Sequence, residues 1–193
     1  MDPAKMEAGI RVFLEGIGER FEGDDLEKTP ARVARAWGEE LVGGYAIEPQ
    51  TEITWTPVEP GLGPVVVRDV RFTSVCVHHL LPFFGQAYVG YLPGERLAGL
   101  SKIGRVVDAH ARRLQTQERL TAAVVSTLDA GLAPRGVIAV LRAEHTCMTC
   151  RGVRKEQGRM VTMASSGIYD RDPATRREIL GLIEGSSGLA NDG

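Results

Sequence analysis

The chain has 193 residues, 43% of them hydrophobic and 25% charged, which fits one globular domain with its own core and excludes fibrous and disordered proteins. Its net charge of -2 argues against nucleic acid as a partner, because no general excess of positive charge is available to neutralise phosphates. No apolar run approaches the roughly 18 residues of a membrane span, and the amino terminus does not resemble a signal peptide. We therefore expect a cytoplasmic protein with no membrane partner.

Two helices are predicted at the amino terminus. Apolar residues recur at helical spacing between residues 10 and 21, as in an amphipathic helix. A second helix is predicted from the cap and first-turn pair Thr29 and Pro30, and it ends at a pair of glycines. These patterns predict an amino-terminal helical region over residues 1–44, followed by a connecting loop over residues 45–63.

The pattern changes to that of strands at Val65. The run VVVRDVRFTSV is rich in β-branched residues and the run QAYVGYLPG ends in a Pro-Gly turn, so together they predict paired strands. Two helices follow, one opened by Ser101 and one with apolar residues at helical spacing from Leu120. The runs GVIAVLRAEH and RMVTMASSGIY predict two more strands, and a last helix is expected to begin at Asp172.

This order of elements predicts an α+β fold. Two strands, two helices and two strands are typical of an antiparallel four-stranded sheet with two helices on one face. We expect this unit to span residues 45–193 and to form one compact body with the helices that precede it.

The cysteines and histidines are concentrated in two short stretches. Three cysteines are too few, and odd in number, for a disulfide framework. Thiolate sulfur and imidazole nitrogen are ligands that zinc prefers, so the two stretches together predict a metal site. The residues concerned are Cys76, His78 and His79 in SVCVHHLLPF, and His145, Cys147 and Cys150 in EHTCMTCRGV.

Two coordination schemes fit these residues. A closed structural site would use four ligands, Cys76, His79, Cys147 and Cys150, whereas a catalytic site would use three ligands and a water molecule. The spacing does not choose between them. The two remaining histidines favour a hydrolytic site, because such a site needs general acids and bases with pKa values near neutrality.

A third group of polar residues lies near predicted helix starts. Ser101, Lys102 and Arg105 fall where free backbone amides and the helix dipole favour anions, which suits a phosphate group. A solvated basic helix face is the alternative, and Arg151 has the same two interpretations. Glu118 fits an acid in the first turn of a helix.

Four stretches, in this order, resemble the GTP cyclohydrolase I family: TPARVARAW, VRDVRFTSVCVHHLLPFFGQAYVGYLP, GLSKIGRVVDAHARRLQTQERLT and HTCMTCRGVRK. The similarity covers about residues 29–169. It implies the tunnelling fold and a toroidal homodecamer with active sites between neighbouring subunits. It also implies zinc-dependent hydrolytic opening of the guanine imidazole ring of GTP, with release of formate and rearrangement to 7,8-dihydroneopterin triphosphate.

The resemblance further implies a role for each matching residue. It selects the open zinc scheme and leaves Cys150 outside it. A carboxylate suits guanine because it accepts from the ring and exocyclic N–H groups together. The implied zinc ligands are Cys76, His79 and Cys147; the proton-transfer residues are His78 and His145; the ribose and triphosphate ligands are Ser101, Lys102, Arg105 and Arg151; the guanine-reading pair is Gln117 and Glu118; and Arg32 is a further candidate for a phosphate contact.

Two positions depart from the family pattern. Val77 stands where the family usually has Glu, and Met160 and Met163 stand where it tends to have a small residue and Thr. Both changes remove polarity near the expected pocket. They keep open the alternative of a non-catalytic or altered-product paralogue on the same fold, and the pathway served, whether folate, pterin cofactor or deazapurine, stays open as well.

Overall fold

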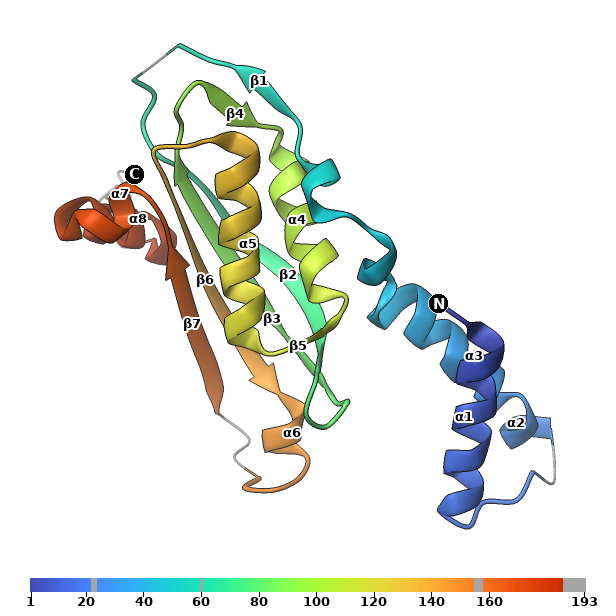
Figure 1. The fold of residues 1–193 in the computed structure, drawn as a ribbon. Helices are drawn as coiled ribbons and strands as arrows, with labels where there is room; N and C mark the ends of the chain where they lie inside the picture. Colours follow the sequence, from blue (N-terminus) through green and yellow to red (C-terminus); the bar gives the residue numbers. More distant parts are fainter. Residues whose placement is uncertain (22–23, 60, 155–157, 186–193) are drawn as a thin grey trace, which may run out of the picture.

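The computed structural model describes residues 1–21, 24–59, 61–154 and 158–185. The amino-terminal helices α1 (Pro3–Gly16), α2 (Asp24–Glu27) and α3 (Thr29–Arg35) form an arm that extends away from the sheet (Figure 1). The Asp2 side chain caps α1 by accepting from the backbone N–H of Lys5. The helix ends at Gly16, earlier than the apolar pattern predicts, and none of its residues is buried within the described chain.

Short regular elements connect α3 to the sheet, and several of them lie in the segment 45–63 that was expected to be a loop. A π-helical turn, η1 (Ala36–Leu41), continues α3, and two 3-10 turns follow, η2 (Gly43–Ala46) and η3 (Pro49–Glu52). Strand β1 (Trp55–Pro57) then pairs antiparallel with β4 (Arg96–Ala98). Three-residue strands are too short for a periodic pattern, which is why the sequence did not predict them.

The main sheet has five strands in the order β5-β2-β3-β6-β7. The four expected strands are present and antiparallel: β2 (Val65–Cys76), β3 (Pro82–Leu92), β6 (Gly136–His145) and β7 (Arg159–Ser165). The structure adds β5 (Leu114–Gln115), which pairs in parallel with the last two residues of β2. The expected α+β class is therefore confirmed, with a two-residue strand beyond the four predicted.

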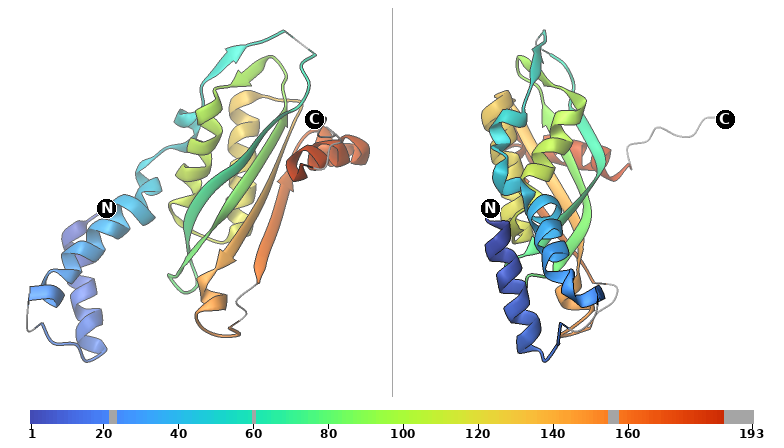
Figure 2. Two further views of the ribbon diagram at one scale, coloured as in Figure 1. Left: turned by 180° about the vertical axis from the view of Figure 1, so that it is seen from behind. Right: turned by 90° about the vertical axis from the view of Figure 1, so that its right-hand side faces the viewer.

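Two long helices cover one face of this sheet. Helices α4 (Leu100–Ala111) and α5 (Gln117–Leu132) lie across the front of the strands in Figure 1 and behind them in the left view of Figure 2. Alternate residues of β3 and β6 meet them in the main core, because successive side chains of a strand point to opposite faces. Core members with no exposed surface include Phe83, Ala87, Val89, Val106, Val107, Leu120, Val124, Ala139 and Leu141.

The carboxyl-terminal helices pack on the opposite face. Helices α7 (Ile168–Arg171) and α8 (Pro173–Glu184) bury Tyr169, Ile179 and Ile183 against Tyr88 and the outward residues of β6. The sheet is thus covered by helices on both faces at one end, which the sequence did not predict. No helix in the described ranges is long and apolar enough to cross a membrane.

Candidate metal centre and active site

The pairing of three strands brings the two cysteine- and histidine-containing stretches together. Strand β2 ends at Cys76, the chain turns back into β3, and β3 also pairs with β6, which ends at His145. The short helix α6 (Thr146–Thr149) follows directly and carries Cys147. Because β3 lies between β2 and β6, the ends of both strands meet at one end of the sheet (Figure 1).

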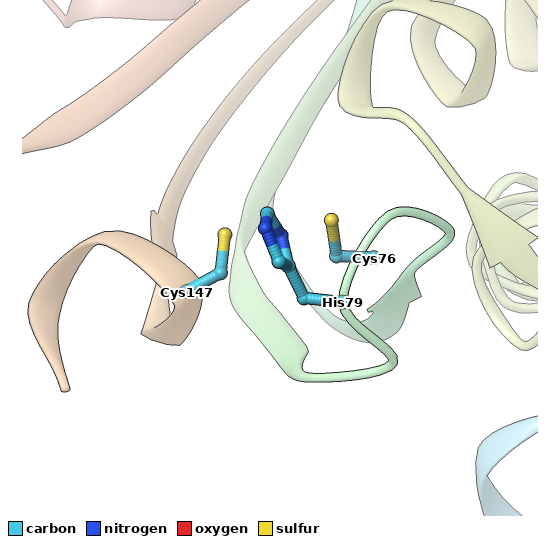
Figure 3. A group of neighbouring side chains, drawn as sticks. All are labelled: Cys76, His79 and Cys147. Carbon is cyan, nitrogen blue, oxygen red and sulfur yellow. The ribbon is translucent and has the colours of Figure 1, made fainter. Parts of the chain in front are cut away.

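Cys76, His79 and Cys147 form a compact group. One ligand atom from each lies within 4.8 Å of the other two, and the three side chains face one another in Figure 3. Burial raises the pKa of the Cys147 thiol, and the neighbouring Cys76 raises it further, so two thiolates here require a cation. Two sulfur donors and one imidazole nitrogen match the ligands that zinc prefers.

Cys150 does not join this group. Its Sγ donates a hydrogen bond to the carbonyl oxygen of Thr146, 2.7 Å away, and the side chain is exposed. If these three side chains held a tetrahedral metal ion, a fourth coordination position would be available to water or substrate, as in catalytic zinc sites.

Two histidines flank the group in different environments. His78 is exposed, and its Nδ1 lies 3.8 Å from Sγ of Cys76. His145 is buried, and its ring stacks on that of Phe83 with centroids 4.5 Å apart and planes 4° from parallel. Burial lowers the pKa of His145, while the nearby charge of Glu118 acts in the opposite direction. Burial thus favours the neutral form of the His145 imidazole.

The start of α5 places Gln117 and Glu118 beside His145. Thr116 caps this helix by accepting from the N–H of Arg119 at 3.3 Å. Glu118 is exposed, but Gln117 is only 1% exposed, and its Oε1 lies 2.8 Å from Nε2 of His145. The Gln117 side chain is thus engaged inside the protein, whereas the Glu118 carboxylate is open to a ligand.

The predicted phosphate ligands are divided between two places. Arg151 follows α6, and its charge lowers the pKa of Cys147, so it lies close to the metal group. Ser101, Lys102 and Arg105 begin α4, which has 12 residues and runs towards the metal end. A helix of that length is about 18 Å long, so its first turn lies far from the metal group of the same chain.

Two of the predicted phosphate ligands, Arg105 and Arg32, are exposed. Arg105 lies 3.7 Å from Glu52 in a solvent-exposed ion pair. Arg32 lies on α3 in the amino-terminal arm, also exposed. A groove of about 710 Å³ is found elsewhere, lined mainly by residues of β2, β3 and β6 together with Asp108 and Arg112 at the end of α4, and none of the predicted site residues lines it.

Comparison with known proteins decides the family. The sequence profile described as GTP cyclohydrolase I matches residues 6–184 of this chain. The chain belongs to the GTP cyclohydrolase I family. This confirms the resemblance read from the four motifs.

Relatives of the family match along nearly the whole chain. The GTP cyclohydrolase 1 of Pelotomaculum thermopropionicum is 43% identical over 96% of this chain and 99% of its own length. Those of Halalkalibacterium halodurans and Mycobacteroides abscessus are 45% and 46% identical, over 96% and 94% of this chain and 98% and 90% of their own lengths. Among solved structures, the archaeosine synthase QueF-Like in its apo form is similar over 55% of this chain and 96% of that one, with a TM-score of 0.47 and 18% identity.

Proposed function

We propose that this protein is a GTP cyclohydrolase I, which opens the imidazole ring of GTP, releases formate and forms 7,8-dihydroneopterin triphosphate. Family membership over residues 6–184, together with the convergence of Cys76, His79 and Cys147, carries this proposal. The free thiols of the metal group suit the reducing cytoplasm, where we place the enzyme.

Different residues of the proposed site would bind the metal, transfer protons and recognise the base. Cys76, His79 and Cys147 would hold zinc, which when bound supplies a Lewis acid that lowers the pKa of water towards neutrality. His145, neutral because it is buried, can accept a proton as the ring opens, and the exposed His78 can exchange protons with solvent. The Glu118 carboxylate accepts from the N–H groups of guanine and would be left unpaired by adenine.

The triphosphate requires a second copy of the chain. Arg151 lies at the metal end, but Ser101, Lys102 and Arg105 begin α4 at its other end. A neighbouring subunit can supply that basic helix start, with its backbone amides, and Arg32 of the arm is a further phosphate contact. We therefore propose a homo-oligomer, most simply the decamer of the family.

Exposed apolar side chains support this assembly. Val12 and Phe13 of α1, and Ile17 directly after it, are each more than 60% exposed in the single chain. Such a stripe on a helix normally packs against another surface. We propose that the helical region over residues 1–44 serves assembly and that residues 45–193 form the catalytic domain; residues 186–193 lie outside the described ranges.

Incubation of the purified, zinc-loaded protein with GTP tests the proposal. Formate and a dihydropterin triphosphate are expected in equal amounts, the latter detected as a fluorescent pterin after oxidation with iodine, and ATP should give neither. If formate is absent and GTP persists, the proposed function is wrong. A product of a different mass would favour the altered-product alternative, to which Val77 beside the metal ligand Cys76 would contribute.

A further inference from the structure

The side-chain amide of Gln117 is held in one orientation. Its Nε2 lies 3.0 Å from the carbonyl oxygen of Leu141 and 3.1 Å from that of Met160. Carbonyl oxygens only accept hydrogen bonds, so the atom that faces them must be the amide nitrogen. A rotated amide would place its oxygen against two others, which fixes Oε1 on the opposite side, towards His145.

This orientation determines which nitrogen of His145 carries a proton. Oε1 of Gln117 accepts and cannot donate, and it lies 2.8 Å from Nε2 of His145. Nε2 therefore bears hydrogen and donates. Nδ1 makes no hydrogen bond with any residue in the described part of the chain, so Gln117 contacts the ring through Nε2 alone.

Two threonines close a ring of hydrogen bonds around the same amide. The Thr121 hydroxyl donates to the Gln117 backbone carbonyl at 2.7 Å, which uses its only hydrogen. Thr162 must then be the donor across the 2.6 Å contact between the two hydroxyls. Nε2 of Gln117 in turn donates to the Thr162 hydroxyl at 3.1 Å. The two hydrogens of Nε2 are shared among three acceptors, on Leu141, Met160 and Thr162, so β6 and β7 hold the amide of this α5 residue from several sides.

We propose that Gln117 is a positioning residue that holds His145 in its Nε2–H form, and that Glu118 alone reads the guanine base. The inference rests on the proposed function and changes the role that the resemblance implies for Gln117. An uncharged amide oxygen accepts from Nε2–H whether Nδ1 is protonated or not. The hydrogen bond from Nε2 and the stack on Phe83 together hold the imidazole ring in one position.

Replacement of Gln117 by Met separates positioning from recognition. Methionine keeps the length of the side chain but neither donates nor accepts a strong hydrogen bond. We expect kcat to fall by roughly 10- to 100-fold, with KM for GTP within about threefold of the parent and zinc content unchanged. Glu118→Gln should instead raise KM by at least about tenfold, because it damages binding of the base.

Gln115→Met is the matched control. Gln115 is also a buried glutamine, but its amide nitrogen donates to the His110 carbonyl rather than contacting His145. Its kcat should stay within about threefold of the parent.

Thr162→Val tests the same ring of hydrogen bonds if the Gln117 variant fails to fold. Valine has the same shape as threonine, so this substitution removes only one hydroxyl from the ring. It should lower kcat several-fold without changing KM.

A spectroscopic measurement tests the tautomer without reference to activity. In ¹⁵N-histidine-labelled, zinc-loaded protein, His145 should show a slowly exchanging Nε2–H signal that is absent in His145→Ala and lost in Gln117→Met. An unprotonated Nε2 in the parent would overturn the proposal. So would a Gln117→Met variant with raised KM and unchanged kcat, as expected of a base-reading residue. If the parent released no formate, the proposed function would fail, while the Nε2–H signal would still decide the role of Gln117.

Discussion

Cys147 and Cys150 lie three residues apart, yet they occupy different environments. Cys147 faces Cys76 and His79, whereas Cys150 turns to the carbonyl oxygen of Thr146. Sequence spacing did not choose between a closed four-ligand site and an open three-ligand site, although the two spare histidines favoured a hydrolytic one. The position of the Cys150 thiol favours the open site.

Replacement of each cysteine by serine tests this assignment. Cys147→Ser should lose most bound zinc, because a hydroxyl is a poor substitute for a thiolate ligand. Cys150→Ser should keep close to one zinc per chain, because its thiol only bonds a backbone carbonyl that a hydroxyl can also reach. Metal analysis after dialysis measures both. Equal loss of zinc from the two variants would restore the closed site.

Among the elements, the contact between β3 and β6 is the one that aligns the site. Gly85 of β3 lies opposite Ala143, and a Cβ atom added to Gly85 would lie 1.9 Å from the carbonyl oxygen of Arg142. The two strands can approach this closely only with glycine at that position. Two residues earlier in β3, Phe83 lies opposite His145, so the same contact sets the position of the stacked rings.

Gly85→Ala should therefore separate the strands and destabilise the protein by about 1–3 kcal/mol. Urea unfolding at fixed protein concentration measures the change. Gly104→Ala is the control, because its nearest neighbour would be a methyl group 3.9 Å away and alanine favours the helix. A Gly85 variant as stable as the Gly104 variant would contradict the close packing of β3 on β6.

Helices α4 and α5 are joined by a contact that should respond to pH. Nε2 of His110 lies 2.8 Å from the Thr127 hydroxyl. Burial lowers the pKa of His110 to about 4, helped by the charge of Arg113 and opposed by that of Glu48. The unfolded chain has an ordinary histidine pKa near 6.5, so below that pH it binds a proton that the folded protein rejects.

The contribution of His110 to stability is therefore complete above about pH 6.5 and declines as the pH falls towards 4. His110→Gln should be less stable than the parent at pH 7.5, but should lose less stability on acidification. Urea midpoints between pH 7.5 and 4.5 measure the difference. Parallel curves for parent and variant would show that His110 does not titrate in this way.

The sequence predicted elements whose patterns are long enough to be periodic. The four long strands and helices α4 and α5 follow from alternation and helical spacing. The metal group was also predictable, because its ligands lie within two short stretches. The hydrogen bond between Gln117 and His145 could not be predicted from the sequence. The threonines that fix the Gln117 amide, Thr121 and Thr162, are 41 residues apart and meet only through the register of β7. Only the folded chain reveals such a contact.

At the scale of the whole molecule, α4 separates two halves of a site. The basic start of the helix and the metal group lie at opposite ends of α4, because β5, which follows this helix, pairs with Cys76, and we propose that one chain does not bring both to one GTP molecule. Two copies can do so, if the metal end of one meets the helix start of the other. The site is then a property of the interface between subunits.

Mixing two inactive variants tests this arrangement. Cys147→Ser damages the metal end and Lys102→Ala damages the helix start, so each alone should be nearly inactive. After joint unfolding and refolding with zinc, random assembly should restore about a quarter of the parental activity, since each half of a site is intact in half of the subunits. Cys147→Ser mixed with Cys76→Ser, both at the metal end, should recover none. Recovery equal in the two mixtures, or absent from both, would place a complete site within one chain.

The ring around Gln117 also ties the chemistry to the alignment of a peripheral strand. Strand β7 is the last strand of the described sheet, and it pairs with β6 on one side only. A slip of one residue along β6 would turn Thr162 to the opposite face and bring Val161 or Met163 against the amide of Gln117. The amide of Gln117 would then lose its contact with Thr162, and His145 would lose a firmly held acceptor for its Nε2–H. The register of β7 thus determines how precisely His145 is positioned, although this strand provides no proposed ligand, acid or base. Redesign of β7 for stability alone could therefore lower activity.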